Sequence, residues 1–256
     1  MIAMDLEEWW PWYDKIASSF NLSRLKDQRA TDILNELLQD KYIEPKDLKK
    51  LIHSKPVLVF GAGPSLENNI YSIKREGLLD KFIIITADGA TTALLEVANR
   101  VPQVVVTDLD GKLQDLILAD QKGASMVVHG HGDNIQQLLK NVPKLTRVLG
   151  TTQVKPKQRV YNFGGFTDGD RAVFFALYMG AEIIALAGMD IGTIIGKYSK
   201  VYVNSPEKKS LKLKFCKKLL EWLASRTDTK LFNLTYYGEK IKGFRDINPQ
   251  KIAHFL

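Results

Sequence analysis

The stretch that decides the fold is residues 82–111, FIIITADGATTALLEVANRVPQVVVTDLDG. It holds two apolar runs, Phe82–Thr86 and Val104–Thr107, and each run stops at acidic and glycine residues. Continuous apolar runs of this length are typical of strands that are buried on both faces of a parallel sheet. Because ligands of open α/β sheets bind just beyond the carboxyl ends of such strands, the stretch predicts a binding site at these two ends.

Three carboxylates occupy the two predicted strand ends. Asp88 follows the first run, and Asp108 and Asp110 follow the second with one residue between them. A D-x-D pair beyond a strand can direct both carboxylates at one hard cation, and Mg²⁺ that carries a substrate phosphate takes oxygen ligands of this kind. The alternative is that Asp108 and Asp110 only cap the following helix, a position in which Asp is common.

Upstream, the apolar run Pro56–Phe60 predicts the first buried strand, which ends in the turn GAGPSL. This turn resembles the opening of a dinucleotide fingerprint, although Leu66 stands where the third glycine belongs. Glycines allow backbone amides to approach a phosphate, so Gly61, Gly63 and Ser65 are candidate nucleotide contacts. A tight turn without any ligand is the alternative.

Downstream, a strand predicted at 124–128 leads into the block HGHGDN. His129 and His131 alternate here and invite a zinc interpretation. Zinc sites use three or four protein ligands, however, and the chain has neither a cysteine pair nor an H-E-x-x-H motif. Asp133, again just past a strand, fits better as a third oxygen ligand beside the D-x-D pair, which leaves the histidines free to contact phosphate.

A second glycine-rich turn follows a strand predicted at 159–163. Gly164 and Gly165 precede Thr167, which begins a helix whose first turn carries Asp168. A glycine pair before a hydroxyl at a helix start suits phosphate binding, so these four residues are further nucleotide candidates. The apolar face of the helix is expected to pack on the sheet.

The last part of the chain carries the positive charge, and the formal net charge of the whole chain is +7. A strand predicted at 182–187 is followed by a loop with Lys197 and then by a lysine-rich helix to about Ala224. A phosphate group carried by Mg²⁺ is stabilised by further positive charge nearby, so Lys197 is predicted to reach a phosphate. For most of these lysines a solvated surface is the alternative. No RNA- or DNA-binding signature accompanies them, so no nucleic acid partner is expected.

Strands and helices alternate along most of the chain, which predicts an α/β fold, a Rossmann-like three-layer sandwich with a mostly parallel sheet. The first 53 residues instead show helical spacing of apolar residues. We therefore expect an N-terminal helical segment, 1–53, and an α/β catalytic domain, 54–256. Within the segment, Asn21 and Ser23 are candidate caps, and Pro45 opens a third short helix.

Composition indicates an ordinary globular chain of 256 residues, of which 45% are hydrophobic and 25% charged. No apolar run approaches the roughly 20 residues that span a bilayer, and the N-terminus lacks the basic-then-apolar order of a signal peptide. We therefore expect no membrane partner and, since the sole cysteine Cys216 cannot form an internal disulfide, a cytoplasmic location. The aromatic cluster around Trp9 and Tyr13 is expected to pack onto the main body. Assembly into a homo-oligomer is left open.

Six blocks within residues 50–245 resemble, in the same order, the archaeal 6-hydroxymethyl-7,8-dihydropterin diphosphokinase family: GAGPS, TADGA, TDLDG, HGHGDN, GGFTDGDRA and GMDIG. The block ADGA followed by D-x-D is also similar to thiamine diphosphokinase, whose catalytic domain the archaeal enzymes are thought to share. By that likeness Asp108, Asp110 and Asp133 are the metal ligands, the set that the residues themselves indicate. The relative's D-F-D-S is D-L-D-G here, and no kinase P-loop is present, so the phosphates must be held in another way.

The resemblance implies an ATP-dependent diphosphotransferase with Mg²⁺ as cofactor and ATP as co-substrate. The expected reaction moves diphosphate from ATP to the hydroxymethyl group of a reduced pterin and releases AMP, in the biosynthesis of tetrahydromethanopterin or folate. The catalytic residues are then Asp108, Asp110 and Asp133, while Asp88 orients the nucleotide or supports the metal.

The sequence leaves the pterin contacts and some alternative activities open. Asn162, Asp168 and Asp190 are unranked candidates for pairing with the amino-pyrimidine edge of the pterin. Other activities that share parts of the pattern are thiamine diphosphokinase and a nucleotide-sugar-dependent glycosyltransferase of the motility accessory type. A non-enzymatic dinucleotide sensor built on the glycine turn is a further alternative, but it needs no D-x-D pair.

Overall fold

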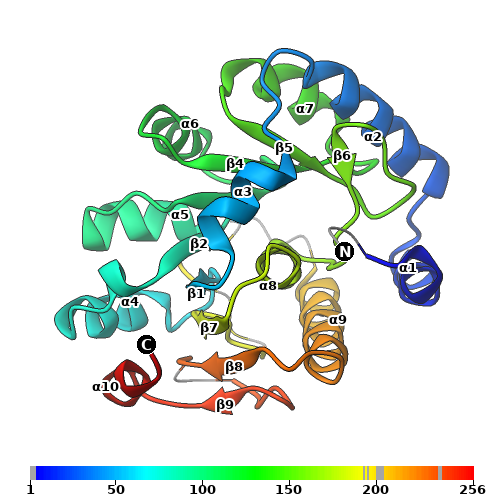
Figure 1. The fold of residues 1–256 in the computed structure, drawn as a ribbon. Coiled ribbons are helices and arrows are strands. Elements are labelled where there is room, and N and C mark those ends of the chain that lie inside the picture. The colour runs from blue at the N-terminus through cyan, green and yellow to red at the C-terminus, as the bar shows by residue number, and fades with distance from the viewer. Residues whose placement is uncertain (1–3, 193, 195, 200–204, 236–237) are drawn as a thin grey trace.

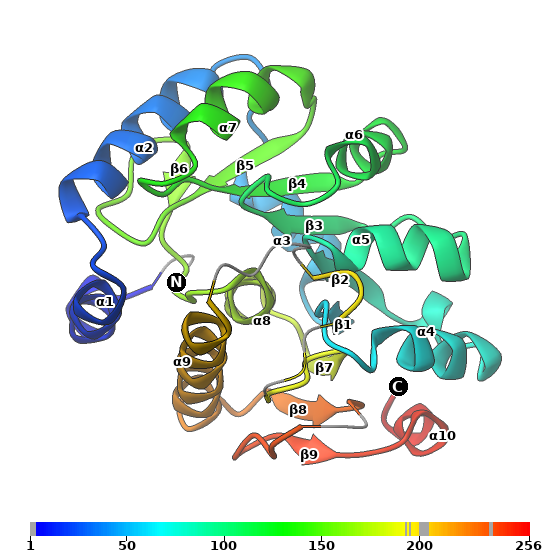
Figure 2. The same ribbon diagram turned by 180° about the vertical axis from the view of Figure 1, so that it is seen from behind.

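The computed structural model describes residues 4–192, 194, 196–199, 205–235 and 238–256 of the chain. None of the helices in these ranges is long and apolar enough to cross a membrane. The described residues form an α/β fold in which helices cover both faces of one parallel sheet, as predicted (Figures 1 and 2).

The sheet is parallel throughout its described strands, and its spatial order is β6-β5-β4-β3-β2-β1-β7-β8-β9. Sequence order reverses beside β1, because β2 to β6 follow on one side of it and β7 to β9 on the other. The strands are β1 (Pro56–Phe60), β2 (Ile83–Ala87), β3 (Val104–Thr107), β4 (Ser125–His129), β5 (Val148–Thr151), β6 (Val160–Tyr161), β7 (Ile183–Ala187), β8 (Lys230–Asn233) and β9 (Arg245–Asp246).

The helices divide into two layers (Figure 1). One face of the sheet packs against α2 (Arg24–Leu37), α4 (Leu66–Arg75), α5 (Ala90–Ala93, continued by a π-helix Leu94–Ala98), α6 (Leu113–Gln121), α7 (Ile135–Asn141) and the C-terminal α10 (Pro249–Ile252). The other face packs against α1 (Leu6–Phe20), α3 (Pro45–Ile52), α8 (Asp168–Tyr178) and α9 (Pro206–Ala224). Successive side chains of a strand point to opposite faces, so in β1 Val57 and Val59 face the second layer while Leu58 and Phe60 face the first.

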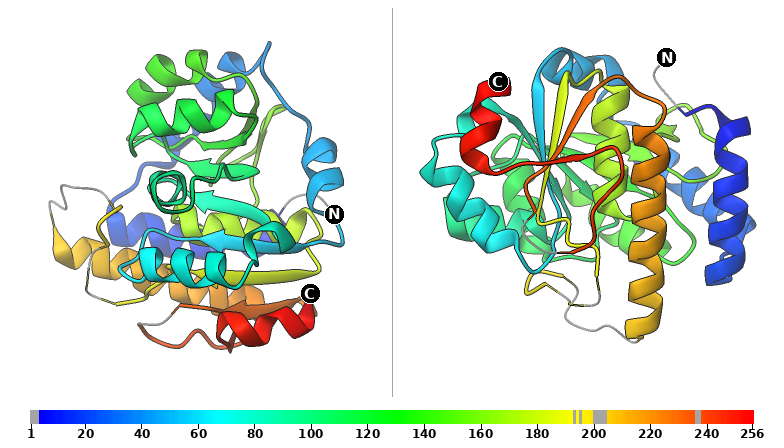
Figure 3. Two further views of the ribbon diagram at one scale, coloured as in Figure 1. Left: turned by 90° about the vertical axis from the view of Figure 1, so that its left-hand side faces the viewer. Right: turned by 90° about the horizontal axis from the view of Figure 1, so that it is seen from below.

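The N-terminal helices contribute to both layers instead of forming a separate body. Ser23 caps α2 as predicted, whereas Asn21 ends α1 in the left-handed conformation with φ 54°. Trp9 and Tyr13 are buried, and the Trp9 indole nitrogen donates to the carbonyl of Gln153 at 2.8 Å, which confirms that this cluster packs onto the main body. Figure 3 shows α1 running beside α9, where two tryptophan rings meet with centroids 5.7 Å apart. The division of the chain at residue 54 stays a prediction.

The structure adds two strands that the sequence pattern did not predict, β5 and β9. Both are short, and β5 contains Gly150, which lowers its resemblance to a buried strand. The glycine is required there, because a Cβ at position 150 would lie 2.8 Å from side-chain carbons of both Leu38 and Val160. The residues around position 150 therefore leave no room for a side chain. As a result, the sequence lacks the apolar residue that would have indicated a strand there.

Asp27 joins the N-terminal helices to the strand ends. It is 2% exposed, and its carboxylate accepts hydrogen bonds from the Tyr13 hydroxyl at 2.8 Å, the Gln153 amide at 2.9 Å and the Gly132 backbone amide at 2.7 Å. These donors come from α1 and from the turns after β5 and β4. One buried side chain in α2 therefore holds three other parts of the fold.

We predict that Asp27→Ala lowers the free energy of unfolding by about 2–4 kcal/mol, because two buried donors and one partly buried donor lose their acceptor. The matched control is Asp14→Ala, which breaks an exposed ion pair with Arg24 and should cost less than about 1 kcal/mol. Urea denaturation of both variants measures the difference. Equal costs would show that Asp27 does not hold these elements together.

Candidate functional site

The carboxyl ends of adjacent strands bring three carboxylates together. Asp88 follows β2, Asp108 follows β3, and Asp168 begins α8, which packs across the middle of the sheet. One ligand oxygen from each of these side chains lies within 4.8 Å of the other two. We call Asp88, Asp108 and Asp168 the carboxylate group. It is the arrangement of hard oxygen ligands that a divalent cation such as Mg²⁺ requires.

The turn around Asp88 is shaped to present its carboxylate. Asp88 has a positive φ of 38°, and its amide donates to the carbonyl of Val106 on the neighbouring strand at 2.8 Å. The Thr107 hydroxyl donates to Oδ1 of Asp88 at 2.5 Å. A Cβ on Gly111 would lie 2.5 Å from Oδ2, so only glycine leaves room for the carboxylate there. The glycine of the block TDLDG is therefore needed for the position of Asp88.

Asp108 is held by contacts with the turn after β4. The Asn134 side-chain amide donates both to the carbonyl of Asp108 at 2.8 Å and to the carbonyl of His129 at 2.7 Å. His131 Nε2 lies 3.4 Å from Oδ2 of Asp108. The next residue, Leu109, has a φ of 67°, and its amide donates to the Thr107 hydroxyl. The blocks TDLDG and HGHGDN, which are distant in sequence, thus form one polar network.

Asp168 is placed by the tight turn before α8. Gly164 and Gly165 both have a positive φ, 82° and 83°, which glycine adopts without strain. The amide of Thr167 donates to Oδ1 of Asp170 at 2.7 Å, and Thr167 precedes the first helical residue. The buried Arg171 donates to the carbonyls of Gly165 at 3.2 Å and of Phe166 at 3.0 Å. The glycine pair and Thr167 therefore fix the start of α8, and with it the position of Asp168.

The carboxylate group is electrostatically unfavourable by itself. Burial raises the pKa of Asp168 well above its ordinary value, and the negative charges of Asp108 and Asp88 raise it further, while Arg171 opposes the shift. Because like charges at short range disfavour ionisation, the three side chains gain most when a cation lies between them. The donor set and this repulsion both fit Mg²⁺.

The predicted metal set and the observed group share Asp108. Asp88, predicted to orient the nucleotide or support the metal, and Asp168, predicted for the nucleotide or the pterin, complete the group, whereas Asp110 and Asp133 lie outside it. Asp133 is exposed, with its amide 3.4 Å from His131 Nδ1. The metal roles of Asp110 and Asp133 stay predictions. The signal that pointed to Asp88 was its place at the end of the strand next to β3, but Asp168 comes from a helix that no sequence spacing relates to β3.

The glycine turn after β1 is engaged with the turn after β7. The amides of Gly61, Gly63 and Ser65 donate to the carbonyl of Ala187, the carbonyl of Gly188 and Oδ2 of Asp190, at 2.9, 2.8 and 3.0 Å. A Cβ on Gly63 would lie 2.2 Å from Oδ2 of Asp190, so glycine is required for this contact between turns. Nucleotide binding by this turn stays a prediction, and in this conformation these three amides already have acceptors within the protein.

The segment Gly196–Ser199 lies over the turns after β1 and β2. A Cβ on Gly196 would lie 2.2 Å from the carbonyl oxygen of Ala62, and one on Gly89 would lie 1.9 Å from that of Tyr198. Lys197 Nζ lies 2.9 Å from Oε1 of Glu67 in the first turn of α4. The segment therefore lies close to the ends of β1 and β2. The phosphate contact of Lys197 stays a prediction.

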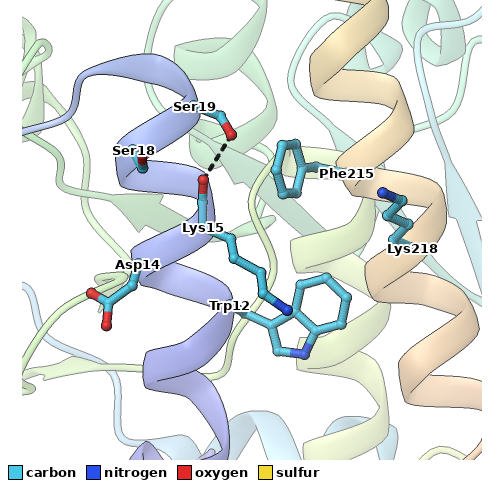
Figure 4. Close-up of a pocket in the computed structure, with 7 residues that line it drawn as sticks. All are labelled: Trp12, Asp14, Lys15, Ser18, Ser19, Phe215 and Lys218. Carbon is cyan, nitrogen blue, oxygen red and sulfur yellow. Dashed lines mark hydrogen bonds between the residues drawn. The ribbon is translucent and has the colours of Figure 1, made fainter.

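A separate groove of about 590 Å³ lies between α1 and α9 (Figure 4). Its lining comes from the two helices alone: Trp12, Asp14, Lys15, Ser18, Ser19, Phe215 and Lys218. None of the predicted site residues lines it. We therefore assign the candidate site to the strand ends, where three carboxylates converge and the pKa of Asp168 is raised, and not to this groove.

Comparisons with known proteins identify close relatives. The model of the family described as 6-hydroxymethylpterin diphosphokinase MptE-like matches residues 30–196. Three archaeal proteins named 6-hydroxymethyl-7,8-dihydropterin pyrophosphokinase are similar over nearly their whole length. The protein from Pyrococcus furiosus is 46% identical over 91% of this chain and 100% of its own. Those from Methanothermobacter thermautotrophicus and Methanocaldococcus jannaschii are 41% and 40% identical, over 89% and 88% of this chain and 99% and 98% of their own.

We predict that Asp168→Asn raises the melting temperature of the metal-free protein, because it removes one of three repelling charges. Millimolar Mg²⁺ should raise the melting temperature of the wild type by several degrees and that of Asp168→Asn much less, since a ligand stabilises the state that binds it. Asp14→Asn, an exposed carboxylate in α1 outside the site, is the matched control and should leave the Mg²⁺ effect unchanged. If Mg²⁺ stabilises Asp168→Asn as much as the wild type, Asp168 is not a ligand.

Proposed function

Since the chain belongs to the 6-hydroxymethylpterin diphosphokinase MptE-like family, we propose that it transfers diphosphate from ATP to the hydroxymethyl group of 6-hydroxymethyl-7,8-dihydropterin and releases AMP. The single observation that carries this function is the 46% identity to a protein of that name over its entire length. The relatives favour this activity over thiamine diphosphokinase and over nucleotide-sugar transfer. The product would enter the biosynthesis of tetrahydromethanopterin or folate.

In this reaction the pterin hydroxyl oxygen forms a bond to the β-phosphorus of ATP. The bond between that phosphorus and the oxygen bridging to the α-phosphorus breaks, AMP leaves with the electron pair, and the hydroxyl proton is released. Such transfers need few covalent contributions from the protein, because catalysis depends mainly on positioning and on neutralising charge. A rigid carboxylate group at the meeting of two strands and a helix suits that demand.

The carboxylate group Asp88, Asp108 and Asp168 would hold Mg²⁺, with Asp110 and Asp133 as the further ligands that the D-x-D spacing suggests. Mg²⁺ in such a site supplies positive charge to phosphate oxygens. The protein's own contribution is rigidity. Thr107 and the Asn134 amide hold the turns that carry Asp88 and Asp108, and the capped start of α8 holds Asp168.

We assign ATP to the turns around this group. The start of α8, with Gly164, Gly165 and Thr167, presents the positive end of a helix dipole to the phosphates. The turn after β1, with Gly61, Gly63 and Ser65, has no bulky side chains, and the amides of these residues already have acceptors in the protein. Its role would be to let the nucleotide approach the backbone closely. Support for this assignment comes from the reversal of strand order beside β1, where ligands of open α/β sheets bind.

Lys197 is the basic residue that we assign to the phosphates. In the described conformation it pairs with Glu67, and its side chain is 66% exposed. Exposed ion pairs contribute little to stability, so the lysine can exchange Glu67 for a phosphate at small cost. Lys200 lies outside the described residues.

We also propose a cytoplasmic location. The sole cysteine, Cys216, is buried and free, which agrees with a reducing compartment.

We expect AMP, and no ADP, to accumulate in step with diphosphorylated pterin when the protein is incubated with ATP, Mg²⁺ and 6-hydroxymethyl-7,8-dihydropterin. Attack at the β-phosphorus produces this pair, whereas attack at the γ-phosphorus produces ADP. Nucleotide chromatography reads the outcome, and Asp108→Asn, which keeps the volume of the side chain and loses its charge, is the inactive control. Stoichiometric ADP, or AMP that forms without the pterin, would refute the proposed reaction.

Lys197→Ala should weaken MgATP binding about fivefold, or roughly 1 kcal/mol, and should flatten the dependence of affinity on salt, because one phosphate contact is lost. Lys208→Ala is the matched control: this lysine is exposed in the first turn of α9. Calorimetric titration with MgATP at two salt concentrations measures both effects. If the two variants behave alike, Lys197 does not contact the nucleotide.

A further inference from the structure

His129 is a buried polar side chain that the proposed chemistry does not yet use. It is the last residue of β4, the strand next to β3, and is 2% exposed. Its ring stacks on that of His131, with centroids 5.8 Å apart, and His131 in turn lies beside Asp108. His129 therefore lies on the β4 side of the carboxylate group, opposite to the glycine turn after β1.

The hydrogen bonds around His129 determine which ring nitrogen carries the proton. The Thr151 hydroxyl donates its only proton to the carbonyl of Val128 at 3.2 Å, so it must accept at its 3.2 Å contact with His129 Nδ1. Nδ1 is thus the protonated nitrogen, and Nε2 carries a lone pair. Among the described residues, Nε2 is buried and has no hydrogen-bond partner.

A buried acceptor without a donor is costly, and such groups are rare unless a ligand or water completes them. Burial, together with the positive charge of Arg171, lowers the pKa of His129 well below its ordinary value, so the ring stays neutral. A neutral ring with a lone pair at Nε2 repels phosphate oxygens, which are themselves acceptors. The missing partner must therefore bring an N–H or O–H donor.

Resting on the proposed function, we propose that His129 Nε2 binds the pterin substrate by accepting a hydrogen bond from one of its N–H or O–H groups. The reduced pterin is an uncharged, flat ring with several such donors, and it must lie beside the carboxylate group so that its hydroxymethyl oxygen meets the β-phosphorus. Arg171 Nε is a second buried atom without a partner among the described residues, and it offers a donor to the ring acceptors of the same substrate.

Three residues that sequence alone left unranked for the pterin fit this role less well. Asn162 is held within the protein, since its amide donates to the carbonyl of Val154 and its oxygen accepts from the amide of Gly164. Asp168 belongs to the carboxylate group. Asp190 follows β7, on the other side of that group, where its Oδ2 accepts from Ser65 and its Oδ1 has no partner among the described residues. The β4 side, with His129, is thereby left for the second substrate.

The test uses two substitutions that distinguish the roles of the two ring nitrogens of His129. His129→Asn keeps an amide near the position of Nδ1, where it can still meet Thr151, but removes the acceptor at Nε2. His129→Gln places an amide oxygen near Nε2. We expect His129→Asn to weaken binding of 6-hydroxymethylpterin and to raise the KM for its 7,8-dihydro form about 10- to 100-fold, with the affinity for MgATP unchanged. His129→Gln should recover part of the loss.

Binding of the pterin is read from its fluorescence, without ATP, so it is measured independently of turnover. His53→Asn, an exposed histidine in another part of the fold, is the control, and melting temperatures with and without Mg²⁺ confirm folding and metal binding. Unchanged pterin affinity in His129→Asn, or a loss of MgATP affinity in its place, overturns the inference while the diphosphokinase reaction stands. A wild-type protein that neither binds the pterin nor produces AMP overturns the proposed function itself.

Discussion

Repulsion among three neighbouring carboxylates is the constraint on which the rest of the site depends. Asp88, Asp108 and Asp168 lie within 4.8 Å of one another through their ligand oxygens, and burial together with the other two charges raises the pKa of Asp168. The fold must hold this arrangement against its own electrostatics. A parallel sheet achieves this, because adjacent strands end at the same edge and their hydrogen-bond ladders leave the turns little freedom to separate. A site that is already assembled binds a cation with little reorganisation.

Polar contacts carry that rigidity outward from the carboxylates. Asn134 joins the turn of Asp108 to the turn after β4, and the amide of Gly132 in that turn donates to Asp27 in α2. Asp27 also accepts from Tyr13 in α1. The N-terminal helices, which contain none of the predicted site residues, are thus linked to the carboxylate group by buried hydrogen bonds. In a low-dielectric interior each hydrogen bond of such a network is stronger than it would be in water, so breaking any one of them is costly.

The two sides of the carboxylate group differ in chemistry. Toward β1 and β7 lies a turn with small side chains, whose amides are hydrogen-bonded within the protein. Toward β4 lies the buried His129, whose Nε2 has no hydrogen-bond partner among the described residues. The proposed reaction between a charged nucleotide and an uncharged ring would use two such different surroundings on either side of the carboxylate group. Direct transfer between two substrates bound in line is consistent with this division.

The sequence by itself determined the fold class, most strand positions and the edge of the sheet where the chemistry lies. Long apolar runs that stop at acidic and glycine residues encode these features locally, through burial and turn geometry. It also predicted Asp108 as a metal ligand, and Asp108 belongs to the carboxylate group. Only the tertiary structure decided which carboxylates join it, because Asp88 and Asp168 are brought to Asp108 by strand pairing and by the packing of α8 across the sheet. The contact of His129 Nδ1 with the Thr151 hydroxyl likewise depends on the pairing of two strands. Contacts between residues far apart in the chain depend on register and helix placement, which no local pattern specifies.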